Sequence, residues 1–447
     1  MTQERILAIH DISCVGRCSL TVALPIISAT GIECSVLPTA VLSTHTGGFT
    51  GFTYRDLTED MIPVDEHWGT LGLKFGAVYT GFLGSFEQID IVKRIIDDVS
   101  DEGTTVYVDP VMADKGKLYT IFGPDFPAGM RKLCEKADVI IPNLTELAFM
   151  MGTEYVEGPY TREYISQVLE DARCFGTKRI VITGVSYEAG TIGAVYMDYE
   201  TGETGEYMTS EIPGYFHGTG DVFGSAFVGA AESGVPLGEA VRIAVRYTYG
   251  SIERTVRDGT DIRYGVNFEE GIRDYIADID AALRAPVFLA VTSPMGLAGL
   301  SWLASTLWHQ AYDDLLPEGQ VDYMLGKYQS LQALMEQLSQ GYVHLVAVSQ
   351  GRQVGYVSYV HREDGTFLSK LYVDENHRRT GIARRAVAAV VSEARAHGLR
   401  RVHLTVNKDN RGAIDAYTRL GFRECGRGVT DIGSGYVMDD IYMELIL

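Results

Sequence analysis

The sequence lacks a long apolar run near its start, and it holds few cysteines. The polar residues after Met1 are followed by only four consecutive apolar residues, Ile6–Ile9, far too few for a signal peptide or a membrane span. Six cysteines in 447 residues do not make a disulfide framework. Cys14 and Cys18 are spaced like metal ligands, but no second Cys/His pair follows them, so a zinc site is not expected there. We therefore expect a cytoplasmic protein with no membrane partner.

Basic residues are scarce in the first part of the chain. Residues 1–285 hold 22 Lys and Arg against 42 Asp and Glu, whereas residues 286–447 hold 16 against 17, within a formal net charge of −21. Such an acidic surface would repel phosphates, so nucleic acid is not an expected partner. Solubility is the simplest explanation for the excess of negative charge.

The length of the chain predicts more than one domain, because single hydrophobic cores stop growing at about 250–300 residues. In the first half, short apolar runs alternate with helical stretches and read as strands buried on both faces; these runs are 6–9, 106–109, 139–141 and 180–183. That alternation predicts an α/β domain with a parallel sheet covered by helices. A helical pattern over 269–283 stops before Pro286, so we place the domains at 1–285 and 286–447.

The second half begins with another apolar run, Val287–Val291. Helical patterns are predicted over 300–312 and 321–338. Two strand-like runs, 344–348 and 354–360, are joined by a turn centred on Gly351.

The sharpest motif in the first half is Gly218-Thr219-Gly220-Asp221, which directly precedes a helical run. Two glycines allow a tight turn, so the amides at the helix start can face an anion. Asp221 could then accept a proton from a hydroxyl that attacks a phosphoryl group. An ordinary aspartate N-cap is the alternative interpretation. Because Gly-x-x-x-x-Gly-Lys-Ser/Thr is absent, any phosphate must be held by this helix start and by magnesium.

Six blocks in a fixed order carry a family resemblance: Leu7–Asp11, Leu42–Gly47, Thr80–Ser85, Val108–Met112, Pro142–Glu146 and Gly218–Asp221. Together they resemble the vitamin B6 kinases, that is, pyridoxal/pyridoxamine kinases of the ribokinase-like class. The resemblance implies a three-layer α/β/α domain that uses ATP and Mg²⁺ to phosphorylate the 5′-hydroxymethyl group of pyridoxal, pyridoxamine or pyridoxine. It also implies a homodimer formed through this domain. The nearest alternative is a hydroxymethylpyrimidine kinase, although such enzymes usually have a glycine-rich stretch where this chain has Ser13–Cys18.

The same resemblance assigns roles around the phosphates. Asp221 matches the catalytic base, and Gly218, Thr219 and Gly220 match the anion hole for the γ-phosphate. The residues that match the holders of Mg²⁺ and the ATP phosphates are Asp109, Asn143 and Glu146, of which Asp109 and Glu146 are the metal ligands. Thr183 and Gly184 match the nucleotide-side loop. Taken alone, Asp109 could be a turn former and Glu146 a helix N-terminal charge.

On the vitamin side, Thr46 matches a residue that contacts the pyridine ring, and its neighbour His45 is either a second contact or a structural turn residue. Asp11 stands where several members carry serine, and Phe82 where many carry tyrosine. The carboxylate of Asp11 could pair with a protonated ring nitrogen or an amine, so the preferred vitamer stays open. Phe82 keeps a stacking surface but has no hydroxyl.

In the second half, a strand-like run over 368–373 leads through Arg378-Arg379-Thr380-Gly381-Ile382-Ala383 into an amphipathic helix. The run 402–406, Asn410, Tyr417 and Leu420-Gly421-Phe422 follow. This order resembles the GNAT acetyltransferases and implies a smaller α/β domain that binds acetyl-CoA.

That resemblance implies that Arg378, Gly381 and Ala383 bind the CoA pyrophosphate. It also implies that Asn410 contacts the CoA arm and that Tyr417 acts as a general acid near the thioester sulfur. Packing is the alternative for Tyr417. The acetyl acceptor is not visible in the sequence. A non-catalytic acetyl-CoA sensor that regulates the kinase is the alternative for the whole second half.

Overall fold

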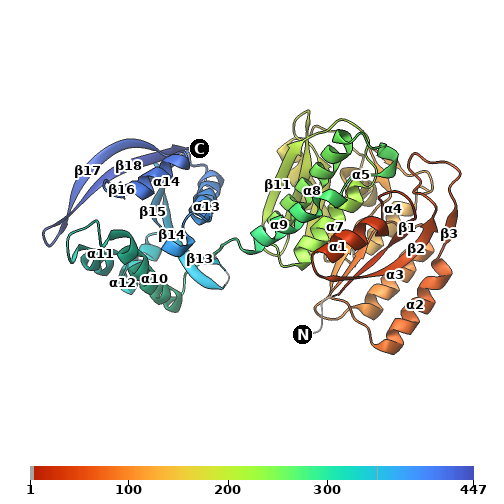
Figure 1. Cartoon of the computed structure of the whole chain (residues 1–447), viewed down its shortest axis with the longest axis horizontal. Helices are drawn as coiled ribbons and strands as arrows, with labels where there is room; N and C mark the ends of the chain where they lie inside the picture. Colours follow the sequence, from red (N-terminus) through yellow and green to blue (C-terminus); the bar gives the residue numbers. More distant parts are fainter. Residues whose placement is uncertain (1–4, 350) are drawn as a thin grey trace. The chain divides into compact units, whose positions relative to one another are not determined.

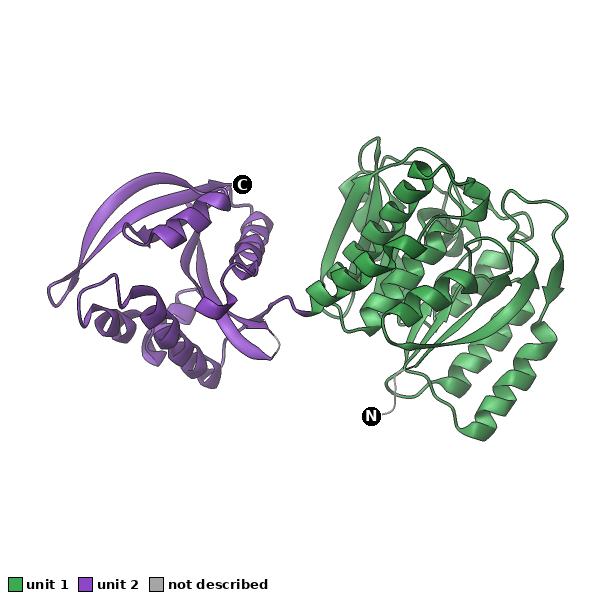
Figure 2. Ribbon diagram, viewed as in Figure 1, with its two compact units in different colours: residues 1–283 green, residues 284–447 purple. Residues whose placement is uncertain are grey.

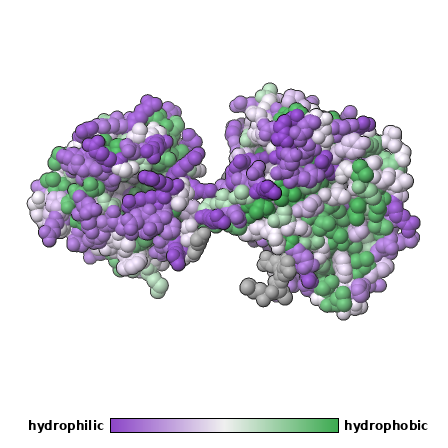
Figure 3. Space-filling view, viewed as in Figure 1, coloured by the Kyte–Doolittle hydropathy of each residue, from purple (hydrophilic) through white to green (hydrophobic). Residues whose placement is uncertain are grey.

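The computed structural model describes residues 5–349 and 351–447. The chain divides into two compact units, residues 1–283 and 284–447 (Figures 1 and 2). The boundary expected after Ala285 lies two residues beyond this division. Hydrophilic residues predominate on the face of the second unit that Figure 3 shows, whereas the first unit shows hydrophobic residues among hydrophilic ones. None of the described helices is long and apolar enough to cross a membrane.

The first unit is built on a nine-stranded sheet with the order β11-β10-β9-β8-β5-β4-β1-β2-β3. Its strands are β1 (Arg5–Ser13), β2 (Glu33–Leu42), β3 (Tyr54–Asp56), β4 (Ala77–Thr80), β5 (Thr105–Val108), β8 (Val139–Ile140), β9 (Arg179–Val185), β10 (Thr191–Asp198) and β11 (Thr204–Ser210). A separate two-stranded hairpin consists of β6 (Ala113–Asp114) and β7 (Lys117–Leu118).

The sheet is parallel only in its centre, from β2 through β1, β4, β5 and β8 to β9. The strands β10, β11 and β3 pair antiparallel at the two edges. The prediction of a parallel sheet was therefore wrong for the edges. The connections from β9 to β10 and from β10 to β11 are too short for a helical crossover, so these strands must turn back on their neighbours.

Helices cover both faces of this sheet (Figure 1). They are α1 (Leu20–Ala29), α2 (Thr58–Leu71), α3 (Phe86–Val99), α4 (Phe126–Cys134), α5 (Leu144–Met151), α6 (Arg162–Asp171), α7 (Thr219–Glu232), α8 (Leu237–Arg257) and α9 (Ile272–Leu283). Alternate residues of β1 supply two separate cores: Leu7 and Ile9 join the core under α2 to α6, and Ile6 and Ala8 join the core under α1, α7, α8 and α9. The predicted three-layer α/β/α architecture is confirmed.

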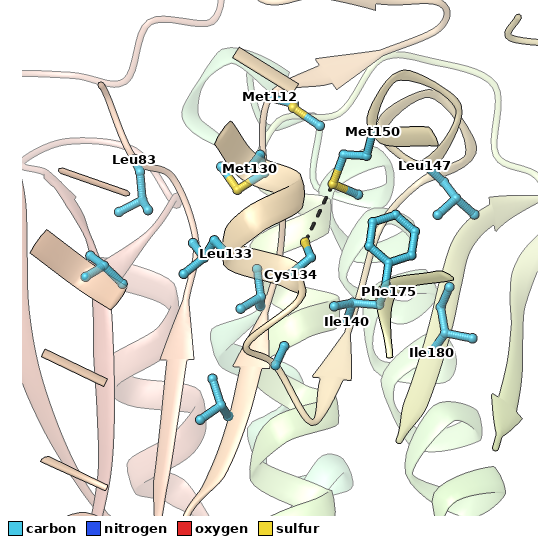
Figure 4. Packing of buried hydrophobic residues seen from close by; sticks show 14 of the residues in the cluster. Leu83, Met112, Met130, Leu133, Cys134, Ile140, Leu147, Met150, Phe175 and Ile180 are labelled. Atoms are coloured by element: carbon cyan, nitrogen blue, oxygen red, sulfur yellow. Dashed lines mark hydrogen bonds between the residues drawn. The ribbon is translucent and has the colours of Figure 1, made fainter. Parts of the chain in front are cut away.

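The first of these cores surrounds α4 and α5 (Figure 4). Cys134 points from α4 toward Met150 of α5, and the ring of Phe175 lies on the same side of α4. The Cys134 thiol is fully buried and lies 3.6 Å from the Met150 sulfur. Polarisable sulfur atoms thus fill the space between the two helices.

The second unit contains a seven-stranded sheet with the order β12-β13-β14-β15-β16-β18-β17. Its strands are β12 (Val287–Ala290), β13 (Val343–Ser349), β14 (Arg352–Arg362), β15 (Gly365–Val373), β16 (Arg401–Asn407), β17 (Arg423–Gly433) and β18 (Tyr436–Ile446). Its helices are α10 (Pro294–Tyr312), α11 (Gln320–Tyr328), α12 (Leu331–Ser339), α13 (Ile382–Ala396) and α14 (Arg411–Arg419).

Two sequence-based expectations for this unit concern a helix and a turn. The single helix predicted over 321–338 is two helices, because the Ser330 side chain caps α12 by accepting a hydrogen bond from the Ala333 amide. In the predicted turn between β13 and β14, Gly351 has φ 73° and Gln350 lies outside the described residues.

The strands β15 and β16 are parallel neighbours that pair at only two positions, Thr366 with Val402 and Phe367 with His403. No other described residues of these two strands are paired with each other in the segments that lead to α13 and α14. A β-bulge at Ser369 interrupts the pairing of β15 with β14. Such a bulge shifts the alternation of side chains, so Lys370 and Tyr372 face the same side as Trp308 of α10.

Candidate functional sites

The first candidate site lies where the central parallel strands end. Asp11 lies near the end of β1, Asp109 follows β5, and Glu146 lies in the first turn of α5 after β8. Their side chains are 5, 7 and 3% exposed. Neighbouring parallel strands end at one edge of the sheet, so the fold gathers these carboxylates although they are far apart in sequence.

The helix α7 brings the fourth carboxylate to this edge. Gly218 precedes the helix with φ 75°, and a Cβ atom there would lie 2.0 Å from the Arg17 carbonyl oxygen. Six residues later, a Cβ at Gly224 would lie 2.3 Å from the Tyr79 hydroxyl and 3.6 Å from the Asp109 carboxylate. These glycines let the start of α7 approach the strand ends, and they place Asp221 in its first turn.

Ser19 links the parts of this site. Its hydroxyl donates a hydrogen bond of 2.6 Å to the Asp11 carboxylate, and its backbone amide donates one to the Asp221 carboxylate. Ser19 has φ 54°, a left-handed conformation that few non-glycine residues adopt. It precedes α1 without capping it. A serine before a helical run predicts an N-cap, so this different role could not be recognised before the structure was known.

The electrostatics of the site are dominated by buried negative charge. Burial, opposed by the hydrogen bond from the Ser19 amide and assisted by the nearby Asp11, raises the pKa of Asp221 to about 7. Burial, together with Glu146 and Asp221, raises the pKa of Asp109 well above its usual range. A bound cation would relieve this repulsion.

The four carboxylates are not equally suited to hold a magnesium ion. Glu146 accepts hydrogen bonds from the backbone amides of Asn143 at 2.9 Å and Met112 at 3.1 Å. Much of the hydrogen-bonding capacity of its carboxylate is therefore used by the backbone. Among the residues that the structure describes, none donates a hydrogen bond to the Asp109 carboxylate. The Asp109 carboxylate therefore has oxygen atoms free to bind Mg²⁺, which prefers hard oxygen ligands. Glu146 is less suited to bind the ion directly and fits better as a residue beside Asp109.

The predicted nucleotide-side residues lie together. The Asn143 side chain accepts a hydrogen bond from the Glu146 amide, and the Asn143 amide donates one to the Glu146 carboxylate, so the two residues form a capping box at the start of α5. The Asn143 side chain also donates a hydrogen bond of 2.8 Å to the Ala113 carbonyl. Asn143 also forms an isolated β-bridge with Thr183, and Gly184 follows with φ 70°. Thr183 and Gly184 are thus adjacent to the edge that carries Asp109 and Glu146.

On the expected vitamin side, His45 has structural partners. The Gly47 amide donates to its Nδ1 at 3.1 Å, so the ring must carry its proton on Nε2, which lies 2.5 Å from the Arg263 carbonyl oxygen. Its ring lies 5.0 Å from that of His217, a residue that the sequence did not single out. The next residue, Thr46, is exposed. Phe82 follows β4 and its ring lies 5.7 Å from that of Phe122.

A second candidate site lies at the start of α13 in the second unit. Gly381 precedes the helix with φ 90° and no side-chain cap, and a Cβ there would meet nothing within 4 Å. The amides of the first turn, which includes Ala383, are therefore suited to an anion. The guanidinium of Arg378 is exposed and donates a hydrogen bond of 3.3 Å to the Val373 carbonyl at the end of β15.

Tyrosine side chains gather near the point where β15 and β16 part. The Tyr312 hydroxyl lies 3.1 Å from that of Tyr372 and also forms a hydrogen bond with Asn410, which caps α14. Burial raises the pKa of Tyr417, and Tyr312 raises it further. The predicted residues Asn410 and Tyr417 are thus brought together with two tyrosines that the sequence did not indicate.

Two charged residues of the second unit were also missed. Burial lowers the pKa of Lys370 to about 8, whereas burial raises that of Asp440, and each group opposes the effect of burial on the other. Asp440 also affects the pKa of Tyr312. Neither residue belongs to a recognisable motif, and only the fold brings strands β15 and β18 to the same place.

The two units match different protein families. Residues 24–265 match the model of the phosphomethylpyrimidine kinase family, and residues 308–422 match that of the GNAT acetyltransferase family. The chain is 27% identical over 264 residues to a pyridoxal kinase of Rubrobacter xylanophilus, which covers 57% of this chain and 88% of that protein.

Solved structures resemble the first unit. One, from Bacteroides thetaiotaomicron, is described as a phosphomethylpyrimidine kinase and was crystallised with pyridoxal; it is 35% identical with a TM-score of 0.59 over 61% of this chain and 96% of that one. A pyridoxal kinase from Lactobacillus plantarum is 30% identical with a TM-score of 0.57 over 62% of this chain and 98% of that one. These matches confirm the resemblances that the motifs indicated.

The close contact between the backbone at Gly218 and the Arg17 carbonyl oxygen leads to a prediction about stability. Replacing Gly218 with Ala should lower the free energy of unfolding by at least about 1 kcal/mol more than replacing Gly31 with Ala, measured by urea denaturation. Both positions have positive φ, at 75° and 90°, so both substitutions carry roughly 1–2 kcal/mol of backbone strain. Only at Gly218 would the new methyl group collide with a backbone carbonyl. Equal losses in the two variants would contradict the predicted contact with Arg17.

Proposed function

This chain belongs to the phosphomethylpyrimidine kinase family and carries a GNAT domain, and we propose that its first unit phosphorylates the 5′-hydroxymethyl group of B6 vitamers with ATP. The observation that carries this proposal is the start of α7, where Gly218 positions Asp221 beside Asp11 and Asp109. Pyridoxal kinases among the relatives, and a similar structure crystallised with pyridoxal, favour a pyridine substrate.

The chemical step follows from the position of Asp221. The substrate hydroxyl oxygen attacks the γ-phosphorus of ATP, its O–H proton passes to the Asp221 carboxylate, and the bond from phosphorus to the ADP oxygen breaks. The amides of Gly218, Thr219 and Gly220 would hold the γ-phosphate oxygens at the positive end of the α7 dipole. Asp109 would hold Mg²⁺, with Glu146 beside it, and the ion supplies positive charge to the phosphates when bound.

Asp11 gives this site a way to recognise a cationic group. Its carboxylate is held by the Ser19 and Ser13 hydroxyls at 2.6 and 3.4 Å. A protonated pyridine nitrogen or amine could pair with it. Such a pair would also weaken the effect of Asp11 on the pKa of Asp221 and so favour the ionised base. Thr46, His45 and Phe82 would complete the contacts to the vitamin.

Substrate preference separates this proposal from its alternative, a hydroxymethylpyrimidine kinase. We expect kcat/KM for pyridoxal or pyridoxamine to exceed that for hydroxymethylpyrimidine when ADP release is measured with the full chain. The reason is that the Leu42–Gly47 and Thr80–Ser85 blocks resemble those of B6 kinases. The opposite order in a direct competition would assign the first unit to the pyrimidine substrate.

Replacing Asp221 with Asn should lower kcat by about 10²-fold or more with ATP binding retained, because the amide cannot accept the proton. In the native chain, kcat/KM should rise with pH through about 7, since protonated Asp221 is inactive as a base and its pKa lies there. The Asp221→Asn variant should lack this rise. The control Asp90→Asn, at an exposed carboxylate on α3, should keep both the rate and the pH profile. A loss smaller than tenfold in Asp221→Asn would rule out the base.

For the second unit, we propose acetyl transfer from acetyl-CoA to an amine. The amine nitrogen attacks the thioester carbonyl, the carbon–sulfur bond breaks, and the amine loses a proton to a base. Tyr417 would donate its hydroxyl proton to the leaving thiolate, and its raised pKa keeps that proton in place until then. Arg378 and the amides around Gly381 and Ala383 would bind the pyrophosphate, and Asn410 would contact the CoA arm. A regulatory acetyl-CoA sensor remains the second candidate.

Replacing Gly381 with Glu should abolish acetyl-CoA binding in calorimetry, because a carboxylate would stand where the phosphates lie. Kinase activity should be unaffected. Gly398→Glu is the matched control: Gly398 also has positive φ and no neighbours within 4 Å, but it follows the opposite end of α13. Undiminished binding by Gly381→Glu would refute the cofactor site.

Tyr417→Phe distinguishes an enzyme from a sensor within the same experiment. If the hydroxyl protonates the thiolate, acetyl transfer to a good amine should fall while the affinity for acetyl-CoA changes little. Unchanged turnover would remove Tyr417 as the acid and favour the sensor.

A further inference from the structure

Two histidines and a glutamate meet at the far end of α13 in the second unit. His361 lies near the end of β14, whereas Glu393 and His397 lie in the last turn of α13 and directly after it. One potential ligand atom from each of the three side chains lies within 4.8 Å of the other two. This cluster is separate from the residues proposed to bind the CoA pyrophosphate, because those lie around the start of the same helix.

Hydrogen bonds leave the ring nitrogens of the cluster suited to a metal. The Nδ1 of His397 lies 2.9 Å from the Glu393 carbonyl oxygen, which can only accept, so Nδ1 carries the proton and Nε2 keeps its lone pair. The Nδ1 of His361 lies 2.9 Å from the Thr366 hydroxyl. That hydroxyl can accept the Nδ1 proton and so leave the second Nε2 free as well. Histidine ligands of metal ions are commonly oriented by such a bond at the other nitrogen.

The position of the three side chains favours a cation. Glu393 and His397 are four residues apart at the end of α13, so they share one face of the helix, and the negative end of the helix dipole lies there. His361 is half-buried, and Glu393 and His397 are exposed, so an ion can reach the site from solvent. The rings of His361 and His397 stack with their centroids 4.2 Å apart, so they must rotate apart to bind one ion.

We propose that His361, Glu393 and His397 form a binding site for a divalent transition metal ion of the zinc type. Two imidazole nitrogens and one carboxylate oxygen are a ligand set typical of Zn²⁺ and unlike that of Mg²⁺, which prefers oxygen alone. Zn²⁺ ligand atoms lie about 2.0–2.2 Å from the ion, so the three side chains can reach one ion once the two rings have rotated out of their stack. Water would fill the fourth position.

Such an ion would connect β14 to the end of α13. The start of this helix carries the amides proposed to bind the CoA pyrophosphate. Metal binding would therefore stabilise the helix on the sheet without taking part in acetyl transfer. The inference stands on the cluster geometry and does not depend on either proposed activity.

The test uses the full chain without a histidine tag, treated with EDTA, dialysed, and then kept in excess MgCl₂ so that sites with oxygen ligands are filled. Calorimetry with ZnCl₂ should detect a site whose affinity falls by on the order of tenfold or more in His361→Ala, in His397→Ala and in Glu393→Gln. Zinc should also raise the melting temperature of the native chain, and this rise should disappear in the variants. The control His309→Ala should bind zinc like the native chain; it removes a histidine in α10 that also has a carboxylate, Asp313, four residues later.

A spectroscopic measurement keeps the test decisive if a variant folds poorly. With one equivalent of Cu²⁺, the electron paramagnetic resonance spectrum of the native chain should show two equatorial nitrogens, and that of His397→Ala should show one fewer. Absence of zinc binding to the native chain, or undiminished binding by the double variant His361→Ala/His397→Ala, would overturn the proposal and leave the cluster as ring packing.

Discussion

The structure of the first unit depends on holding several carboxylates close together, away from water, at one edge of a parallel sheet. Burial and mutual repulsion oppose the ionised state of Asp11, Asp109 and Asp221. Ser19 compensates part of this cost by donating two hydrogen bonds, and it does so with a positive φ of 54°. The positive φ at Gly218 and the close approach of α7 at Gly224 serve the same arrangement. Together these local features support the proposed site for magnesium and phosphates.

The two units share one local feature, a helix start that is suited to an anion. In each, a glycine with positive φ precedes a helix that has no side-chain cap, so the first amides stay available: Gly218 before α7 and Gly381 before α13. The difference lies in what stands beside them. An aspartate with a raised pKa occupies the first turn of α7, which suits the proton abstraction proposed for the first unit. The first turn of α13 has no acidic residue and follows an arginine loop, which suits the pyrophosphate binding proposed for the second unit.

The candidate residues that could be found from the sequence are those that lie in compact motifs. Gly218–Asp221 and Arg378–Ala383 combine a turn, a helix start and a functional side chain within a few letters, so the pattern carries the chemistry. This was not possible for four other residues, Ser19, His217, Tyr312 and Lys370, because only the fold brings each of them close to its partners. The structure also refines expected roles: hydrogen bonds hold His45 to Arg263 and Glu146 to backbone amides, which the letters could not reveal.

The sequence alone determined the alternation of strands and helices, the two-part organisation and the families, because hydrophobic periodicity and short motifs are local properties. The antiparallel edges of the first sheet, the break between α11 and α12, and the separation of β15 from β16 were decided by tertiary structure. Strand direction, strand pairing and the burial of a charge depend on which distant segments become neighbours. That is also why the gathering of carboxylates around Ser19, and of His361 with Glu393 and His397, could be recognised only in three dimensions.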